Sequence, residues 1–306
     1  MNVLLFSPGP DTAGLGAGMR AAFKAQGHSA RHVRLQDSPW RYPVDITWNR
    51  DDAAQSAQVT KLWREADIVH IFEKPECATW FPTRKGLVVH HLGTFYRSRP
   101  AEVSAQCRAI GATECADMHD LVRLSGAEWL PDVIDMEPLA KLRERTYEPA
   151  ASIRISHAPT NRIYKSTDVI LAAIEALSRK YPIEFDLIEG VSNAECVTRK
   201  ARSDIFVDEL TLGYGLNALE CWSMGIPVVS GIANQDTREM MVRDFDRRAT
   251  PFVEANPGNL LGILEWLCDE AARRREWGRI GLEHARLYHS QKAVVERAIE
   301  IYRSAA

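Results

Sequence analysis

Residues 204–230 read DIFVDELTLGYGLNALECWSMGIPVVS and decide the fold. The stretch opens with an apolar run closed by two acids, residues 205–209, which predicts a buried strand. A glycine turn at residues 213–215 leads into an amphipathic helix that carries Glu220, and a second strand follows at residues 228–230. This order predicts N–H groups at a helix N-terminus with a carboxylate one turn further on. Such a cradle suits a phosphate together with a sugar diol.

The same stretch resembles the donor-binding signature of the retaining GT-B glycosyltransferases of family 4. That signature runs roughly Glu-Gly-Phe-Gly-Leu, then Glu, then Gly-x-Pro-Val, and GYGLNALECWSMGIPVV fits every part except the first acid. Leu212 stands where the family usually has a Glu that contacts the donor sugar, and Asp208 or Glu209 can replace it. The resemblance implies that Glu220 accepts hydrogen bonds from the ribose hydroxyls, since a carboxylate offers only acceptors to a vicinal diol. It also implies donor contacts from the glycine turn, at Gly213, Tyr214, Gly215 and Leu216.

A second segment, HAPTNRIYKST at residues 157–167, joins a predicted strand to a predicted helix. It is similar to the family's HAPSNxxxKGT segment, whose basic residues hold the donor diphosphate. The resemblance implies this role for Arg162 and Lys165, with Asn161 beside them. Two fixed cations and a helix N-terminus would stabilise the charge of a diphosphate leaving group without a metal. The alternative is that both are solvated loop cations.

The N-terminal half opens with an apolar strand, residues 2–7, then a glycine-rich loop, and then a helix predicted at residues 19–26. This opening is typical of a doubly wound nucleotide-binding domain. The spacing of Gly14, Gly16 and Gly18 differs from G-x-G-x-x-G, so a dinucleotide is not indicated. The resemblance implies that Gly16 faces the donor phosphates and the acceptor. The alternative is a glycine needed only for turn geometry.

The segment HHLGTFYR at residues 90–97 is similar to the family's His-x-Gly-Ser/Thr-x-x-Arg segment. The resemblance implies that His91 lies near the anomeric carbon or the diphosphate of the donor. Its predicted place, the carboxyl end of a parallel strand, is where ligands bind in such sheets. The alternative is a histidine whose polar atoms are satisfied within the protein.

The resemblance implies an α/β chain with the GT-B fold, in which two Rossmann-like doubly wound domains face each other across a cleft. The charged, proline-bounded segment 135–151 is the best linker candidate. We therefore expect an N-terminal acceptor-side domain over residues 1–145 and a C-terminal nucleotide-sugar donor domain over residues 146–306. The last of the C-terminal helices is expected to cross back to the N-terminal domain.

The composition excludes several classes of protein. A net charge of −3 without a long basic run argues against a dedicated nucleic-acid binder. Six scattered cysteines without a CxxC pair favour free thiols in a reducing cytosol, and no apolar segment is long enough to span a membrane. We expect a soluble, cytoplasmic protein. The acids of Asp244-Phe245-Asp246 lie in a polar stretch and are interpreted as surface residues, so no metal and no cofactor are expected.

The leading hypothesis is a metal-independent retaining glycosyltransferase that moves a sugar from a nucleotide-diphosphate sugar to an acceptor hydroxyl. The alternatives are a nucleotide-sugar epimerase or phosphorylase-like enzyme of the same fold, and a non-catalytic nucleotide-sugar binding protein, which Leu212 motivates. The acceptor class stays open among saccharides, lipids and small molecules, and the charge balance disfavours modified DNA. The sugar, the nucleobase and the oligomeric state also stay open.

Overall fold

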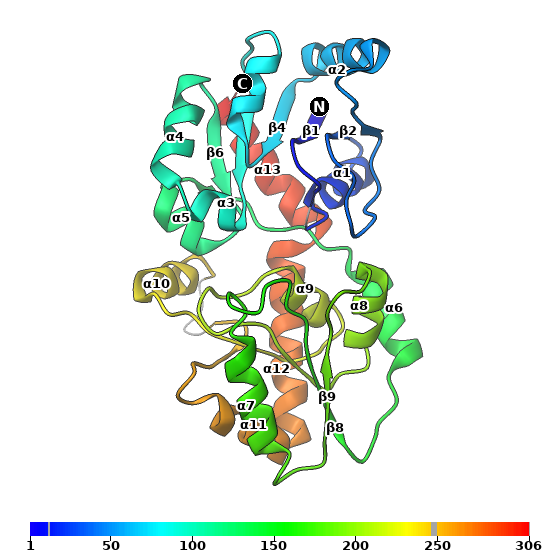
Figure 1. Cartoon of the computed structure of the whole chain (residues 1–306), viewed down its shortest axis with the longest axis vertical. Coiled ribbons are helices and arrows are strands. Elements are labelled where there is room, and N and C mark those ends of the chain that lie inside the picture. The colour runs from blue at the N-terminus through cyan, green and yellow to red at the C-terminus, as the bar shows by residue number, and fades with distance from the viewer. Residues whose placement is uncertain (12, 246–249, 306) are drawn as a thin grey trace. The chain divides into compact units, whose positions relative to one another are not determined.

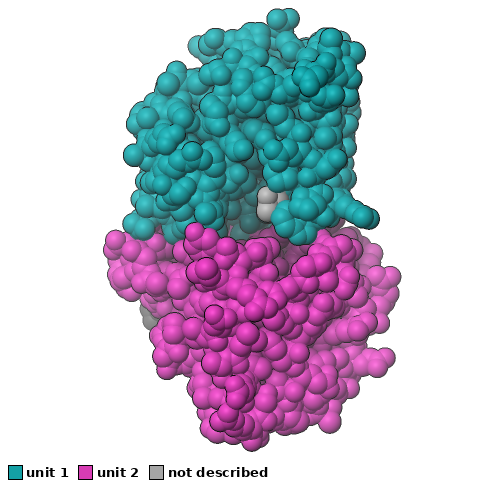
Figure 2. Space-filling model, in the orientation of Figure 1, with its two compact units in different colours: residues 1–133, 289–306 teal, residues 134–288 magenta. Residues whose placement is uncertain are grey.

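The structure, a computed structural model, describes residues 1–11, 13–245 and 250–305 of the chain. The chain forms two compact units, coloured separately in Figure 2. Unit 1 comprises residues 1–133 and 289–306, and unit 2 comprises residues 134–288. Each unit has its own parallel sheet and its own apolar core.

The sheet of unit 1 has seven strands in the order β3-β2-β1-β4-β5-β6-β7, and all of its neighbours are parallel. The central strands β4 and β5 are buried along their whole length, because helices cover both faces of a doubly wound sheet. The strands are β1 (Asn2–Ser7), β2 (Ser29–Arg34), β3 (Ile46–Thr47), β4 (Ile68–Phe72), β5 (Leu87–His91), β6 (Thr113–Ala116) and β7 (Glu128–Trp129).

The helices of unit 1 include one from the far end of the chain. These helices are α1 (Leu15–Ala25), α2 (Ala53–Glu65), the 3-10 helix η1 (Pro75–Trp80), α3 (Gly93–Arg97), α4 (Pro100–Ala109), α5 (His119–Ser125) and α13 (Gln291–Ala305). Tyr302 of α13 stacks on Phe23 of α1 with ring centroids 5.8 Å apart. Helix α13, red in Figure 1, thus packs into the same apolar core as β1.

The sheet of unit 2 has five parallel strands in the order β12-β11-β10-β8-β9. The strands are β8 (Ile153–His157), β9 (Ile183–Leu187), β10 (Ile205–Val207), β11 (Val228–Ser230) and β12 (Val253–Glu254). Their helices are α6 (Met136–Thr146), α7 (Thr167–Leu177), α8 (Asn193–Lys200), α9 (Leu216–Ser223), α10 (Gln235–Asp244), α11 (Leu260–Asp269) and α12 (Ala271–His284). A π-helical turn, η2 (Ala285–His289), links α12 to α13.

These two parallel sheets with flanking helices confirm the predicted α/β class and its two Rossmann-like halves. The division between the units falls after residue 133, earlier than the predicted boundary near residue 145. The reason is that α6, part of the predicted linker, packs on unit 2. Its Arg143 donates hydrogen bonds to the carbonyls of Ala201 and Ser203 at 2.6 and 2.7 Å.

The structure bears on two further expectations, the Asp-Phe-Asp triplet and the absence of a membrane-spanning segment. Asp244 ends α10, but Asp246 of the Asp-Phe-Asp triplet lies outside the described residues. Among the helices that the structure describes, none combines the length and the apolar character needed to cross a membrane.

Candidate active site

The order of the strands in unit 2 reverses between β8 and β10. The chain passes from β8 to its neighbour β9 on one side, and later strands add on the other side beyond β10. In open α/β sheets, ligands bind outside the carboxyl ends of the strands at this switch point. His157 ends β8, and Asp208 directly follows β10, so the two predicted motifs of unit 2 meet here.

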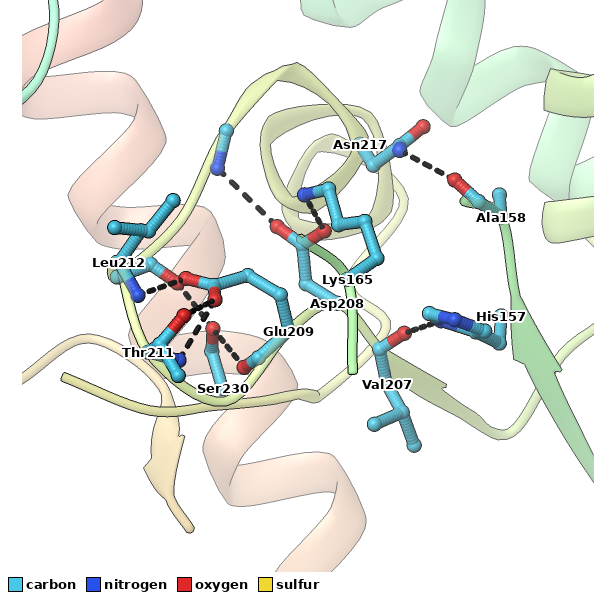
Figure 3. Close-up of polar contacts among 12 residues, drawn as sticks. His157, Ala158, Lys165, Val207, Asp208, Glu209, Thr211, Leu212, Asn217 and Ser230 are labelled. Atoms are coloured by element: carbon cyan, nitrogen blue, oxygen red, sulfur yellow. Dashed lines mark hydrogen bonds and ion pairs between the residues drawn. The ribbon is translucent and has the colours of Figure 1, made fainter. Parts of the chain in front are cut away.

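Asp208 fixes the predicted cation of the second motif. Its Oδ1 lies 2.5 Å from Nζ of Lys165, and its Oδ2 accepts a 3.2 Å hydrogen bond from the N–H of Gly215 (Figure 3). The Asp208 side chain is 1% exposed, whereas that of Lys165 is 20% exposed. The Lys165 side chain is therefore partly open to solvent at the switch point, while a buried carboxylate sets the position of its ammonium group.

Glu209 shapes the loop that carries Leu212. One carboxylate oxygen accepts from the backbone N–H and the hydroxyl of Thr211 at 2.7 and 3.0 Å, and the other accepts from the N–H of Leu212 at 2.6 Å (Figure 3). Burial, opposed by Lys165 and helped by the adjacent Asp208, raises the pKa of Glu209 to about 7. Both oxygens of Glu209 thus hold the turn, and its contact with a donor sugar stays a prediction.

The glycine turn differs from the predicted open cradle. The N–H of Gly213 donates to the carbonyl of Gly231 at 2.8 Å, and that of Gly215 donates to Asp208. The Tyr214 side chain is 8% exposed, and its ring packs 4.8 Å from that of Trp222, so it belongs to the core. Leu216 begins α9, whose first N–H groups have no intrahelical partner, as at any helix start.

Glu220, in the second turn of α9, lies in a buried polar network. One oxygen accepts a 3.0 Å hydrogen bond from Nδ2 of Asn193, and the other pairs with Nζ of Lys200. Although burial opposes its charge, the carboxylate of Glu220 raises the pKa of Lys200 above its usual value. Asn217 accepts from the same ammonium at 2.8 Å. It also donates to the carbonyl of Ala158 at 2.9 Å (Figure 3).

The loop after β8 is held by its own polar side chains. Nδ1 of His157 bonds the carbonyl of Val207 at 2.8 Å, so it is the protonated nitrogen, and Nε2 accepts from the Thr167 hydroxyl at 2.9 Å. Burial lowers the pKa of His157, which keeps this tautomer neutral. The chain from the sheet to α7 therefore has a fixed path.

The predicted residues Asn161 and Arg162 lie on the exposed part of this loop. The side-chain oxygen of Asn161 accepts from the N–H groups of Ile163 and Tyr164 at 3.0 and 3.2 Å, which closes a turn. Arg162 forms a bidentate pair with Glu189, with N–O distances of 2.8 and 2.5 Å. Arg162 is thus a solvent-facing cation beside the switch point.

The predicted residues of unit 1 are buried in its interior. His91 is fully buried, bonds Glu114 at 2.7 Å and stacks on Tyr96 with ring centroids 3.9 Å apart. The N–H of Gly16 donates to Asp11 at 3.0 Å, and a Cβ at this glycine would lie 2.3 Å from the His32 ring. In this structure both residues make packing and hydrogen-bonding contacts within unit 1, and their donor contacts stay predictions.

Unit 1 has its own switch point between β1 and β4, and Glu73 follows β4 there. Its backbone has φ +71°, a left-handed conformation that is uncommon for a residue with a side chain. Burial, opposed by Lys74, raises the pKa of the Glu73 carboxyl to about 7. The sequence pattern did not single out this residue.

Two groups of side chains in unit 1 have the composition of metal ligands. One is His70, His90 and Cys115, and the other is His91, Cys107 and Glu114. In the first group, His70 already bonds His90 at 3.2 Å and the hydroxyl of Tyr302 at 2.8 Å. The bonds of His70 to His90 and Tyr302, and of His91 to Glu114, thus hold these histidines within the core of unit 1.

Comparisons with solved structures place this geometry among known folds. HepE from Anabaena, in complex with UDP and glucose, matches with a TM-score of 0.64 and 13% identity over 99% of this chain and 100% of its own. An alpha-glucosyltransferase in complex with UDP and a DNA containing an HMU base matches with a TM-score of 0.65 and 12% identity, covering 99% of both chains. The chain has the GT-B fold.

A third similar structure is the catalytic domain of starch synthase IV from Arabidopsis thaliana, bound to ADP and acarbose. It matches with a TM-score of 0.64 and 10% identity over 100% of this chain and 99% of its own. No protein-family profile matches the sequence, and no curated protein matches it in sequence. The resemblance to family 4 within this fold stays a prediction.

Lys165 and Arg162 lie on the loop after β8, and Glu220 lies on α9, the helix after β10, so all three belong to elements that follow the two strands of this switch point. Their contacts with a donor stay predictions. Lys200 and Asn193 belong to the same network, but no motif in the sequence singled them out. A charged residue near the end of a helix is usually a solvated one. The available signal was that Asn193 and Lys200 are seven residues apart, which places them on one face of α8.

Proposed function

We propose that the chain is a glycosyltransferase that moves a sugar from a nucleoside-diphosphate sugar to an acceptor hydroxyl. The observation that carries the proposal is the pairing, at the switch point of unit 2, of an anchored cation with a buried carboxylate. The cation is Lys165, which Asp208 fixes, and the carboxylate is Glu220. The GT-B fold, whose similar structures include glycosyltransferases with bound UDP, supports the same proposal.

In this proposal, different residues of unit 2 bind different parts of the donor. Glu220 accepts hydrogen bonds from the ribose hydroxyls, since a carboxylate presents only acceptors to a diol. Lys165 and Arg162, with the N-terminus of α9, receive the diphosphate. When the bond from the sugar to the diphosphate breaks, negative charge grows on the leaving oxygen, and cations already in place stabilise it without reorganisation.

This distribution of charge supports a reaction that needs no metal. Lys165 is held in position by Asp208 but keeps one fifth of its side chain exposed, so it can approach an anionic ligand. We propose that the transfer retains the configuration of the anomeric carbon, by attack of the acceptor on the face that the diphosphate leaves. Retention rests on the resemblance of the two motifs to family 4.

The acceptor class stays open. The similar structures carry glucose, a DNA or acarbose beside the nucleotide, which are chemically different molecules. We propose that unit 1 supplies the acceptor contacts, with Glu73 at its switch point as a carboxyl group that can bind a hydroxyl. The six free cysteines support the proposed cytoplasmic location, where thiols stay reduced.

Thermal unfolding with a panel of nucleotides tests the donor site. We expect one of UDP, GDP, ADP, CDP and dTDP to raise the melting temperature equally with and without EDTA. A ligand at a hundred times its dissociation constant adds about 2.7 kcal/mol of stability. At the same nucleotide concentration, the shift is expected to fall to about half or less in Lys165→Ala and Glu220→Ala. If none of the five stabilises the wild-type chain, the proposal is wrong.

Product stereochemistry tests retention. Once the stabilising nucleotide is known, its α-linked glucose and other sugar conjugates can be incubated with the chain. Proton NMR then reads the anomeric configuration of the product, or of the free sugar when water acts as the acceptor. An inverted product would contradict the proposed front-face attack and leave the donor site unaffected.

A further inference from the structure

Lys200 is a buried charge next to the carboxylate that we assign to the ribose. Its side chain is 0% exposed, and its ammonium bonds Glu220 and, at 2.8 Å, the side-chain oxygen of Asn217. The ammonium also lies 5.7 Å from the centre of the Phe206 ring in β10. The chain therefore holds a full positive charge in its interior at this position.

Burying an ion pair is rarely the most stable solution. The desolvation of two charges offsets most of their attraction, and an apolar pair of similar volume is often as stable. A buried pair is better explained by what it orients than by the stability that it adds. Here it orients Glu220, whose side chain is buried except for 6% of its surface.

Two residues of helix α8 donate hydrogen bonds to the Glu220 carboxylate, one to each oxygen. Asn193 in its first turn donates to one oxygen at 3.0 Å, and Lys200 at its end donates to the other. A carboxylate oxygen has two acceptor positions. One position on each oxygen of Glu220 stays available, and two such positions on one rigid group match the two hydroxyls of a ribose.

We propose that Lys200 is a positioning residue for nucleotide recognition: it holds the Glu220 carboxylate charged and oriented so that it binds the 2′- and 3′-hydroxyls of a ribonucleotide. Lys200 itself touches no part of the donor. Asn217 steadies the ammonium from the other side through its bond to the carbonyl of Ala158, just beyond β8. This inference rests on the proposed function, and the test below separates the two.

The discriminating measurement is the ratio of dissociation constants for a ribonucleoside diphosphate and its 2′-deoxy counterpart. Isothermal titration with UDP and 2′-deoxyuridine diphosphate gives this ratio, and ADP with its deoxy form provides a second pair. We expect the wild-type chain to bind the ribose form about tenfold to a hundredfold more tightly, as for a hydrogen bond to a charged group. In Lys200→Met the ratio is expected to fall below about threefold.

A matched control lies on the same helix. Arg199→Met removes the neighbouring cation, which pairs with Asp186 outside this network, and is expected to leave the ratio at its wild-type value. A loss of stability alone would weaken both ligands equally and would not change the ratio. The ratio therefore separates positioning of Glu220 from a purely structural role of Lys200.

Lys200→Met leaves the Glu220 carboxylate buried without its counter-charge and can fail to fold. Lys200→Gln covers that case, because it removes the charge but keeps a side-chain N–H group that can donate to Glu220. We expect it to fold and to have a ratio between those of the wild-type chain and Lys200→Met. If a folded Lys200 variant keeps the wild-type ratio, the inference is wrong.

Binding measurements on the wild-type chain distinguish the proposed function from the role of Lys200. Equal binding of UDP and 2′-deoxyuridine diphosphate would overturn the role of Lys200 and Glu220 at the ribose, while nucleotide binding itself would stand. Binding of none of the diphosphates would overturn the proposed function, and this inference with it.

Discussion

Lys165→Ala is expected to change both the stability of unit 2 and its affinity for a diphosphate. Removing one partner of a fully buried ion pair costs about 3–5 kcal/mol, because the other charge is left without compensation. The Asp208 side chain is 1% exposed, so it would be such a charge, but Lys165 is 20% exposed and water screens part of the pair. We therefore expect a loss of about 2 kcal/mol, between the values for exposed and buried pairs.

The assay is thermal unfolding of the wild-type chain and two variants, followed by titration with UDP. A loss of about 2 kcal/mol corresponds to a fall in melting temperature of about 4–8 °C for a domain of this size. Lys165→Ala/Asp208→Asn is expected to recover most of it, because the amide oxygen of the introduced asparagine can still accept the hydrogen bond of Gly215. Affinity for UDP is expected to fall at least about tenfold in both variants, since both lack the cation.

Two results would refute this reasoning. If the double variant is no more stable than Lys165→Ala, the loss does not come from an uncompensated Asp208. If UDP binds Lys165→Ala as tightly as it binds the wild-type chain, Lys165 acts only in the fold, and the diphosphate must be held elsewhere.

Three further predictions concern the same edge of unit 2. Burial raises the pKa of Glu209 to about 7, so the folded chain holds this proton more tightly than the unfolded chain. The free energy of unfolding should therefore fall by about 1.4 kcal/mol per pH unit as the pH rises from about 4.5 to 7. Denaturant unfolding at pH 5 and pH 8 should therefore show a smaller fall for Glu209→Gln, and parallel falls would contradict this. Gly213→Ala should lower the free energy of unfolding, measured by thermal unfolding, by about 2 kcal/mol, because φ at Gly213 is +102° and the new Cβ would lie 3.2 Å from Met241. The control is Gly262→Ala in α11, whose new Cβ meets open space and should cost no stability. Arg162→Gln should melt like the wild-type chain, since its pair with Glu189 is exposed, but titration should show weaker binding of UDP; unchanged binding would leave Lys165 as the main phosphate ligand.

The sequence predicted the elements of residues 204–230 closely because every boundary there has a local cause. The apolar run gives β10, the glycine turn precedes α9, and Gly225 with φ +67° ends the helix before β11. The site residues of this stretch followed from the same pattern. Lys165 and Glu220 could be named because the two segments that contain them resemble motifs of family 4, and their contacts with a donor stay predictions.

The glycine-rich loop of unit 1 was interpreted less well. The first helix was predicted at residues 19–26, whereas α1 begins at Leu15. The reason is that Asp11 accepts from the N–H groups of Gly16 and Ala17 and so caps a helix whose first turn contains glycines. Glycine disfavours a helix locally, but the cap and the close packing against His32 decide the outcome.

Contacts between distant segments explain what the sequence could not provide. The N–H groups of Gly213 and Gly215 are taken by Gly231 and Asp208, which approach only once β10 and β11 pair. In the same way Lys200 meets Glu220 only because the fold brings α8 and α9 together. The residue pattern within each helix does not predict this contact between Lys200 and Glu220.

The three acids after β10 and on α9 suggest how the chain tolerates Leu212. Asp208 pairs with Lys165, Glu209 holds the turn, and Glu220 pairs with Lys200 and accepts from Asn193. A carboxylate at position 212 would stand in a turn that is already fixed, because Glu209 accepts from the N–H groups of Thr211 and Leu212, and the Ser230 hydroxyl bonds the carbonyl of Gly213. In the proposed donor site, Leu212 offers no charged contact to the sugar, and the residues that we assign to the nucleotide do not include it. Leu212→Glu should accordingly alter the choice of sugar while the affinity for UDP alone stays within about twofold of the wild-type value, because no contact to the diphosphate or ribose changes.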